Sequence, residues 1–323
     1  MPKAIVVHQV GGPEVLRFED VADPVPGPGE ATVRQTAIGV NFIDVYFRKG
    51  LYKAPRLPFV PGQEGAGVVE AVGPGVSEVA VGDRVAYANL EGAYAEVRLA
   101  PAARLVKLPP GIDDETAAAM MLKGMTAEYL LLRCARVAHG DTILFHAAAG
   151  GVGSIACQWA KHLGLRVIGT AGGAEKVALA AARGCDHAID YDREDIVAGV
   201  NALTGGAGVS AVFDGIGQRT FAASLACLGA RGMMVLFGQA SGSVPPIDPS
   251  VLGKASLFLV RPSLVHYIAT PNELVTSATR AFELVAGGAV RIGIGQRYAL
   301  RDAVAAHREL EGRRTTGSTV LLP

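Results

Sequence analysis

Residues 146–164 read HAAAGGVGSIACQWAKHLG, and this stretch decides the fold. An apolar run leads into it, and an amphipathic helical pattern begins at Gly151. The spacing follows the fingerprint G-x-G-x-x-G, with Ala148 at the first glycine position and Gly150 and Gly153 at the other two. We therefore predict a strand, a tight turn and a helix N-terminus that binds a pyrophosphate. Taken alone, the pattern is also typical of an ordinary glycine-rich turn.

The sequence around this stretch alternates short apolar runs with amphipathic helical patterns. Such alternation is typical of βαβ units, in which helices cover both faces of a parallel sheet. We therefore predict a doubly wound α/β sheet with six parallel strands at 142–146, 166–170, 187–190, 208–214, 231–238 and 256–260.

The two ends of the chain show a different pattern. Residues 113–137 predict two helices that are hinged near Gly124. The segment after Pro262 predicts helix, strand, helix and strand, and it is too short to fold alone, so we expect it to complete an N-terminal domain. That domain is predicted to be β-rich, because Gly, Pro and Asp separate short β-prone runs at 4–9, 32–40, 65–73, 84–89 and 94–100.

Composition and charge exclude several classes of function. Thirty basic residues balance thirty acidic ones, so no net field favours nucleic acid or an anionic membrane. No apolar run is long enough to span a bilayer, and the N-terminus lacks the pattern of a signal peptide. Cys134, Cys157, Cys185 and Cys227 have neither metal nor disulfide spacing, which favours a cytoplasmic protein with reduced thiols.

The end of the second predicted strand indicates which dinucleotide binds. An NAD site carries Asp or Glu there for the ribose hydroxyls, and this strand end has neither. A carboxylate would repel a 2′-phosphate, whereas Thr170, the Gly172–Gly173 loop and Lys176 could accept one. Lys176 alone is equally well explained as a solvated helix residue, so the missing acid is the stronger sign. We predict NADPH in preference to NADH.

Three stretches carry a resemblance to a known family: PGQEGAGVVEAVGPGVSEVAVGDRVAY (61–87), LKGMTAEYLL (122–131) and the glycine-rich stretch. Over essentially its whole length the chain resembles the medium-chain dehydrogenase/reductase superfamily, and within it the quinone oxidoreductase, ζ-crystallin-like family. FLVRPSL (258–264) and the ending RRTTGSTVLLP support that branch. The resemblance implies a GroES-like β-rich catalytic domain at 1–124 and 267–323, a Rossmann domain at 125–266, and an active site in the cleft.

The resemblance also permits a comparison with the zinc alcohol dehydrogenases of the superfamily. They place zinc ligands, Cys and His, where this chain has Asn41 and Gln63. Amides cannot replace thiolate or imidazole, and the carboxylates Asp44 and Glu64 alone are poor zinc ligands. We therefore predict a zinc-independent reductase. A quinone suits it because an electron-poor quinone accepts hydride without a Lewis acid, and a conjugated enone is the next easiest acceptor.

The resemblance implies a set of site residues. Asn41, Tyr46 and Tyr52 would meet the substrate, although the two tyrosines are equally well explained as packing aromatics. Asn41, Ile43 and Asp44 would face the nicotinamide, and Phe258 and Val260 its carboxamide. The remaining contacts to the cofactor would come from Lys123, Tyr129, Gly150, Gly151, Val152, Gly153, Thr170, Gly172, Gly173, Lys176, Tyr191, Gly238, Gln239, Ala240, Ser241 and Arg313 (or Arg314).

Two further points follow from the resemblance. Residues 256–260 would form an edge strand that pairs in a homodimer. Gly215 stands where family members often have Ser or Thr, so one hydrogen bond to the cofactor is not carried over from the resemblance.

Four functions are compatible with the sequence. An NADPH-dependent quinone reductase is the leading interpretation, and an NADPH-dependent reductase of α,β-unsaturated carbonyls is the alternative. A non-catalytic NADPH-binding or RNA-binding protein is a third, disfavoured by the balanced charge. A zinc alcohol dehydrogenase is the fourth.

Overall fold

The computed structural model describes residues 1–54 and 56–323, which form two compact units. The first unit contains Met1–Met125, Ile268–Ala286 and Ile292–Pro323, and the second contains Thr126–Tyr267 and Gly287–Arg291. The predicted boundaries place residues 287–291 with the chain ends. In the structure they join the second unit, where the backbone N–H of Arg291 donates to Gln158 Oε1 (3.0 Å).

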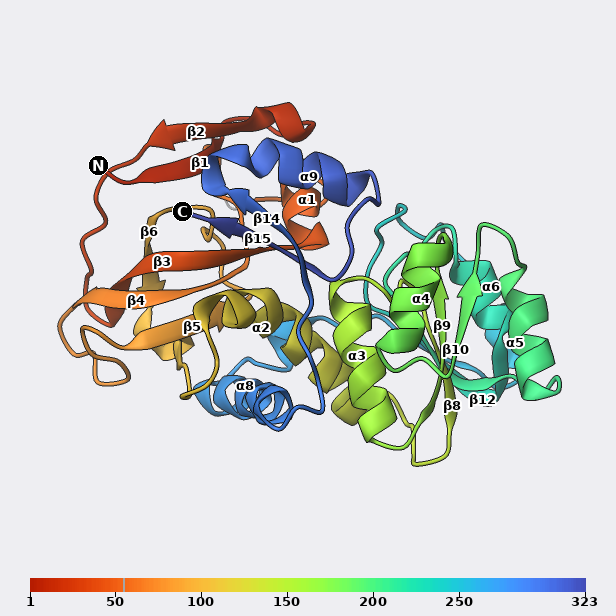
Figure 1. The fold of residues 1–323 in the computed structure, drawn as a ribbon. Helices are drawn as coiled ribbons and strands as arrows, with labels where there is room; N and C mark the ends of the chain where they lie inside the picture. The colour runs from red at the N-terminus through yellow and green to blue at the C-terminus, as the bar shows by residue number, and fades with distance from the viewer. Residues whose placement is uncertain (55) are drawn as a thin grey trace. The chain divides into compact units, whose positions relative to one another are not determined.

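The second unit is built on a parallel sheet with the strand order β10-β9-β8-β11-β12-β13 (Figure 1). The strand order reverses between β8 and β11, and the carboxyl ends of these two strands flank the switch point at which doubly wound sheets bind ligands. The predicted six-stranded doubly wound sheet is confirmed. Its strands are β8 (Thr142–Phe145), β9 (Arg166–Ala171), β10 (His187–Asp190), β11 (Val209–Asp214), β12 (Leu228–Leu236) and β13 (Phe258–Val260).

Helices cover both faces of this sheet because its strands are apolar on both sides. Figure 1 shows α3 (Gly151–His162) beside α4 (Ala174–Ala182), and α5 (Ile196–Thr204) beside α6 (Phe221–Ala226). A short α7 (Ser250–Gly253) precedes β13. Leu144, Ile168, Val212 and Met234 are fully buried in one core cluster, which joins the central strands to α5 and α6.

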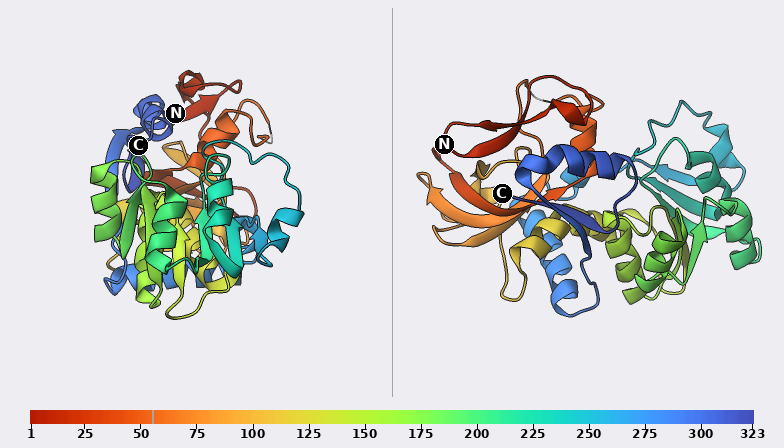
Figure 2. Two further views of the ribbon diagram at one scale, coloured as in Figure 1. Left: turned by 90° about the vertical axis from the view of Figure 1, so that its right-hand side faces the viewer. Right: turned by 45° about the horizontal axis from the view of Figure 1, so that its top comes forward.

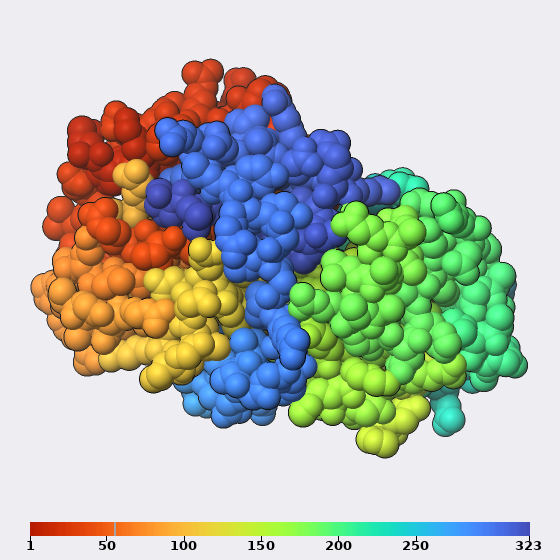
Figure 3. Space-filling view, viewed as in Figure 1, coloured from red at the N-terminus to blue at the C-terminus, as the bar shows by residue number. Residues whose placement is uncertain are grey.

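The first unit is built on a mostly antiparallel sheet with the order β14-β15-β3-β4-β5-β7, with β6 also paired to β3. β15 pairs antiparallel to β3, so the last strand of the chain extends the sheet begun by the first hundred residues. Figures 2 and 3 show the blue C-terminal segment packed against the red and orange N-terminal segment. The strands are β3 (Glu30–Val40), β4 (Glu64–Val72), β5 (Arg84–Ala88), β6 (Val97–Pro101), β7 (Val106–Lys107), β14 (Ile294–Ala299) and β15 (Ser318–Leu322).

Further elements of the first unit are a separate hairpin and several helices. The hairpin pairs β1 (Lys3–Val7) with β2 (Leu16–Asp20). The helices are α1 (Phe42–Arg48), α8 (Pro271–Ala286) and α9 (Ala303–Glu311).

The predicted hinge near Gly124 is wrong. One continuous helix, α2, runs over Asp114–Tyr129 and continues into a π-helical turn at Leu130–Cys134. A Cβ atom on Gly124 would lie 3.3 Å from the Cβ of Ala281 in α8, so this glycine permits close packing of two helices. A glycine inside a helical pattern therefore marks a helix contact here and not a break.

Among the helices of the described residues, none is both long and apolar enough to cross a membrane.

Candidate active site

The glycine-rich loop joins β8 to α3 through a tight turn. Ala147 adopts a left-handed φ of 53°, and Gly150 is the N-cap of α3. A Cβ on Gly153 would overlap the carbonyl oxygen of Ala147 and lie 2.8 Å from the Cα of Ala148. Only glycine at 153 lets the helix start this close to the loop. The unpaired N–H groups of the first helical turn, at Gly151 and its neighbours, are then presented at the carboxyl end of β8, where they favour an anion.

The loops after β11 and β12 are joined to one another by backbone hydrogen bonds. The N–H of Ala240 donates to Gly215 O (3.2 Å), and the N–H of Ser241 donates to Ile216 O (2.8 Å). A Cβ on Gly238 would lie 2.5 Å from Gly215 O, so this position also requires glycine. The structure thus brings the predicted residues Gly238, Gln239, Ala240 and Ser241 to the carboxyl edge of the sheet.

A second group of predicted residues gathers at the ends of β9 and β10. The Asp190 carboxylate accepts the backbone N–H of Gly173 (3.0 Å) and of Asp192 (3.1 Å), which holds the two loops together. A Cβ on Gly172 would lie 2.7 Å from the hydroxyl of Tyr191. Lys176 follows in the first turn of α4. Gly172, Gly173, Lys176 and Tyr191 are therefore neighbours.

Thr170 does not fit the role predicted for its side chain. The residue is 1% exposed, and its hydroxyl is bonded to Nδ1 of His146 (3.0 Å). Because the hydroxyl points into the unit, the prediction that it accepts a phosphate is corrected.

In the first unit a buried charge cluster forms around Glu64. Asn41, the N-cap of α1, donates from Nδ2 to Glu64 Oε1 (2.8 Å), and Lys123 Nζ forms an ion pair with the same carboxylate. The N–H of Leu122 donates to Glu64 Oε2 (2.6 Å). The side chains of Asn41, Glu64 and Lys123 are each at least nine-tenths buried. Because a buried charge is costly without partners, the Glu64 carboxylate needs these contacts. The structure brings together Asn41 and Lys123, which are far apart in the sequence.

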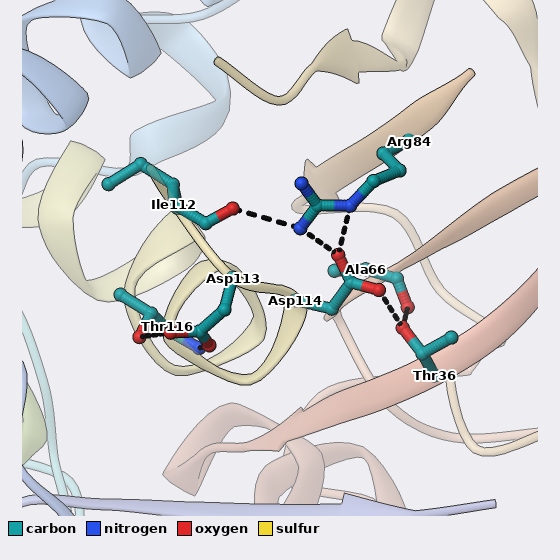
Figure 4. A network of polar contacts seen from close by, with 7 residues as sticks. All are labelled: Thr36, Ala66, Arg84, Ile112, Asp113, Asp114 and Thr116. Carbon is teal, nitrogen blue, oxygen red and sulfur yellow. Dashed lines mark hydrogen bonds and ion pairs between the residues drawn. The ribbon is translucent and has the colours of Figure 1, made fainter. Parts of the chain in front are cut away.

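The start of α2 is anchored to the sheet, and this anchoring places Lys123. Asp113 caps the helix by accepting the N–H of Thr116 (2.7 Å), as Figure 4 shows. Asp114 accepts the hydroxyl of Thr36 on β3 (2.7 Å) and Nε of Arg84 on β5 (2.9 Å). With the first turn fixed to two strands, the helix carries Lys123 onto the carboxylate from β4.

A directional chain of hydrogen bonds ends on Asp44. Arg48 is donor only, so His307 Nδ1 accepts from its Nη1 (3.1 Å), and His307 Nε2–H then donates to the hydroxyl of Tyr94 (3.0 Å). That hydroxyl donates to Asp44 Oδ2 (3.0 Å), which also accepts the N–H of Asn41 (2.8 Å). Every donor in the chain therefore points toward Asp44.

Asp44 is fully buried, and its second carboxyl oxygen, Oδ1, lacks the hydrogen bonds that Oδ2 receives. Among the described residues, Oδ1 of Asp44 is the buried side-chain oxygen or nitrogen that has no hydrogen-bond partner. Burial raises the pKa of Asp44 to about 7, with a further rise from the charge of Glu64, against the opposing effects of Asn41, Tyr94 and Lys123. This side chain does not reach the surface, so the prediction that Asp44 faces the nicotinamide is not supported for its carboxyl.

The aromatic residues after Asn41 form a cluster. Tyr46 and Tyr52 meet edge to face with ring centroids 5.2 Å apart, and Phe47 contacts Tyr52 at 5.7 Å. Tyr46 is 9% exposed and Tyr52 is half-buried. Both predicted roles, packing and substrate contact, remain compatible with this geometry.

The other predicted residues lie on separate elements. Tyr129 is buried and stacked on Tyr267 (4.4 Å), and burial raises its pKa. Phe258 is 42% exposed on β13 beneath the guanidinium of Arg136 (5.1 Å). Ile43 is half-buried in α1, Val152 is half-buried in α3, Val260 is half-buried in β13, and Arg313 is exposed in the turn after α9.

In residues 1–54 and 56–323, no group of three or more His, Cys, Asp or Glu is arranged to hold a metal ion. Gln63, which the resemblance aligns with a zinc ligand, is buried, as is its neighbour Glu64.

Sequence reasoning missed the polar residues that support these sites. His146, Asp214 and Ser224 form a buried network beside the glycine loop, and Tyr94 and His307 lead to Asp44. A signal was present for His146 and Asp214, since each ends an apolar strand directly before a glycine-rich loop. No comparable signal marks the other three.

Comparison with known proteins agrees with this architecture. Residues 27–110 match the alcohol dehydrogenase GroES-like domain, and residues 151–277 match the zinc-binding dehydrogenase family. The chain is similar to a quinone oxidoreductase of Pseudomonas aeruginosa, with 51% identity over 100% of both chains. It is also 45% identical to a 2-haloacrylate reductase of a Burkholderia species, over 100% of this chain and 99% of the relative.

A solved structure of a quinone oxidoreductase has the same fold as this chain. The crystal structure of Escherichia coli quinone oxidoreductase complexed with NADPH superposes with a TM-score of 0.97 at 44% identity, covering 99% of this chain and 100% of the other. The chain belongs to the quinone oxidoreductase family. Membership of the quinone oxidoreductase family confirms the resemblance to the medium-chain dehydrogenase/reductase superfamily and the predicted pairing of a GroES-like sheet with a Rossmann sheet.

The burial of Asp44 predicts a dependence of stability on pH. The folded state keeps a proton on Asp44 up to about pH 7, whereas the unfolded chain loses it near pH 3.8. The folded state therefore binds more protons between these values, and the free energy of unfolding should fall as pH rises through this window. In Asp44→Asn, which mimics the neutral acid, this fall should be largely absent.

Urea unfolding followed by circular dichroism at pH 5, 6, 7 and 8 measures the effect. Asp23→Asn is the matched control, because Asp23 is exposed and should leave the wild-type dependence intact. Equal pH dependence in wild type and Asp44→Asn would show that Asp44 is ionised throughout.

Proposed function

We propose that the protein is an NADPH-dependent quinone reductase that transfers hydride to a quinone without a metal. The observation that carries the proposal is the glycine-lined loop at the switch point, where no Cβ fits at Gly153 and Gly150 caps the N-terminus of α3, a helix end that favours an anion such as a pyrophosphate. The reduced nicotinamide supplies the hydride when the cofactor is bound. The relative that is complexed with NADPH supports the same cofactor.

The second unit offers the residues that would hold this cofactor. Gly150, Gly151, Val152 and Gly153 would bind the pyrophosphate through backbone N–H groups. Lys176 and Tyr191 would bind the 2′-phosphate. Support for NADPH over NADH comes from the end of β9, where Ala171 carries no acid for the ribose hydroxyls.

The first unit offers the residues that would meet the acceptor. We propose that Tyr46 and Tyr52 orient the quinone ring by edge contacts and by hydrogen bonds to its carbonyl oxygen, and that Asn41 aids them. The donor set at positions 41 and 63 consists of amides, which suit hydrogen bonding and not zinc ligation. We propose that the first unit acts as the catalytic domain and the second as the cofactor domain, which follows the predicted division into 1–124 with 267–323 and 125–266 except that residues 287–291 join the second unit.

A second candidate is a reductase of α,β-unsaturated carbonyl compounds. The 2-haloacrylate reductase, a relative at 45% identity, favours it. Enones and quinones share a carbon–carbon double bond conjugated to a carbonyl, so one site could reduce either by hydride addition.

We also propose that the protein acts in the cytoplasm. The described cysteines are free thiols, three of them buried, which suits a reducing compartment. Fractionation of the native cells tests this location.

The leading function predicts that the protein oxidises NADPH when a quinone is added. The loss of NADPH absorbance measures the rate. The kcat/KM for 1,4-benzoquinone and a naphthoquinone should exceed the kcat/KM for enones, enals and 2-haloacrylate. NADH should be a weaker donor. Binding of NADPH without turnover on any quinone would refute the proposal, and a higher kcat/KM for enones would favour the second candidate. Reactions without protein give the background rate.

The acceptor role of the tyrosines predicts a specific loss. Tyr46→Phe combined with Tyr52→Phe should lower kcat/KM for the quinone about tenfold, because about 1.4 kcal/mol of hydrogen bonding is removed. The Kd for NADPH should stay unchanged. Tyr298→Phe, on β14 of the same unit, is the matched control. Wild-type kinetics in the double variant would reduce the two tyrosines to packing residues.

We propose that the protein is a homodimer formed through β13. This strand stands at the end of the strand order and carries the exposed Phe258, and pairing would cover its edge. Sedimentation equilibrium should give twice the chain mass of 33.3 kDa, and Phe258→Glu should give the monomer. Val265→Glu, at an equally exposed position, should remain dimeric. A monomeric wild type would contradict the proposal.

A further inference from the structure

A buried polar chain lies beside the glycine loop of the second unit. It consists of Asp214, Ser224, His146 and Thr170, and none of the four is more than 1% exposed. Burial of so many polar groups is costly unless each has a hydrogen-bond partner. Each of them has one within the chain, and none belongs to the sites predicted from the sequence except Thr170.

The acceptor end of the chain is Asp214, the last residue of β11. Its Oδ1 accepts the N–H groups of Ile216 (2.7 Å) and Gly217 (2.9 Å). Its Oδ2 accepts the hydroxyls of Thr220 (2.7 Å) and Ser224 (2.8 Å). A carboxylate with four donors is saturated, and it fixes the turn that follows β11.

The direction of the remaining bonds follows from this end. The single proton of the Ser224 hydroxyl goes to Asp214, so Ser224 Oγ accepts from His146 Nε2 (2.9 Å). Burial lowers the pKa of His146, although the charge of Asp214 opposes it, so the ring is neutral and Nδ1 carries no proton. Nδ1 then accepts the hydroxyl of Thr170 (3.0 Å).

The same residues are tied together through the main chain. His146 is the last residue before the loop, and its N–H donates to Phe213 O on β11 (3.0 Å). The N–H of Ala148, inside the loop, donates to Thr170 O on β9 (3.0 Å). Side-chain and main-chain bonds therefore connect the exits of β8, β9 and β11, the strands around the switch point.

We propose that His146 is a positioning residue for the dinucleotide: it holds the loops after β8, β9 and β11 at the spacing that cofactor binding requires. It acts through Thr170 and Ser224, because its own ring is buried. The inference rests on the proposed NADPH-dependent function. It assigns cofactor affinity to this chain of hydrogen bonds, whereas the groups proposed to meet the acceptor lie in the first unit.

Isosteric variants test the inference. Thr170→Val leaves His146 Nδ1 without a donor, and Ser224→Ala leaves Nε2–H without an acceptor, with little change of volume. Each should raise the Kd for NADPH about tenfold, because the loops that these bonds join are then no longer held at the spacing that cofactor binding requires. The kcat at saturating NADPH should stay unchanged. Trp159, the single tryptophan and part of α3, reports binding through its fluorescence.

Thr204→Val is the matched control. The Thr204 hydroxyl donates to Val200 O (2.8 Å) and accepts from Gly208 N (3.2 Å) at the C-terminal end of α5, at the opposite edge of the sheet. Its Kd for NADPH should equal that of wild type. Melting temperatures show which variants fold. If Thr170→Val does not fold, the Kd of Ser224→Ala is compared with that of the wild type instead.

A measurement on the wild type needs no variant and no ligand. Nitrogen-15 NMR of the histidine rings should show His146 with a protonated Nε2 and a bare Nδ1 over the neutral pH range. A ring protonated at Nδ1, or folded variants with wild-type Kd, would overturn the inference. A wild type that binds no NADPH would instead overturn the proposed function, and the tautomer would still be measured.

Discussion

Helix α3 has to begin in direct contact with the loop that leaves β8, and the second unit depends on this close approach. Gly153 permits it because any side chain would overlap the backbone of Ala147 and Ala148. Ala147 turns the chain with a left-handed φ of 53°. We propose that backbone N–H groups meet the anion here, where charged side chains would otherwise be needed. A protein with no net charge can therefore bind a highly charged cofactor.

Both units bury chains of polar side chains, and in each the direction of the hydrogen bonds is set at one end. Arg48 can only donate, which gives His307 its proton at Nε2. Asp214 accepts four donors, which gives His146 the same tautomer. The two chains differ in their ends: the first leaves Asp44 Oδ1 without a partner, whereas the second is fully satisfied. We expect the first to respond to pH and the second to be rigid.

Local patterns predicted the features that depend on neighbours in the sequence. The glycine spacing located the tight turn between β8 and α3, and the alternation of apolar runs located six parallel strands. The same reasoning failed at Gly124, where the glycine permits close packing against Ala281 of another helix. It failed again at Thr170, whose hydroxyl is bonded to His146, the residue directly after the adjacent strand β8. In both places the deciding contact is distant in the sequence.

The sequence by itself determined the fold class, the position of the glycine loop and the amides at 41 and 63, because each is a matter of residue type and local spacing. The tertiary structure decided which polar groups are buried together. Glu64 meets Lys123 only because the start of α2 is anchored on β3 and β5, and His146 meets Ser224 only because α6 packs on the sheet. A buried polar group needs a hydrogen-bond partner in space. Because that partner is often far away in the sequence, the local sequence pattern does not reveal it.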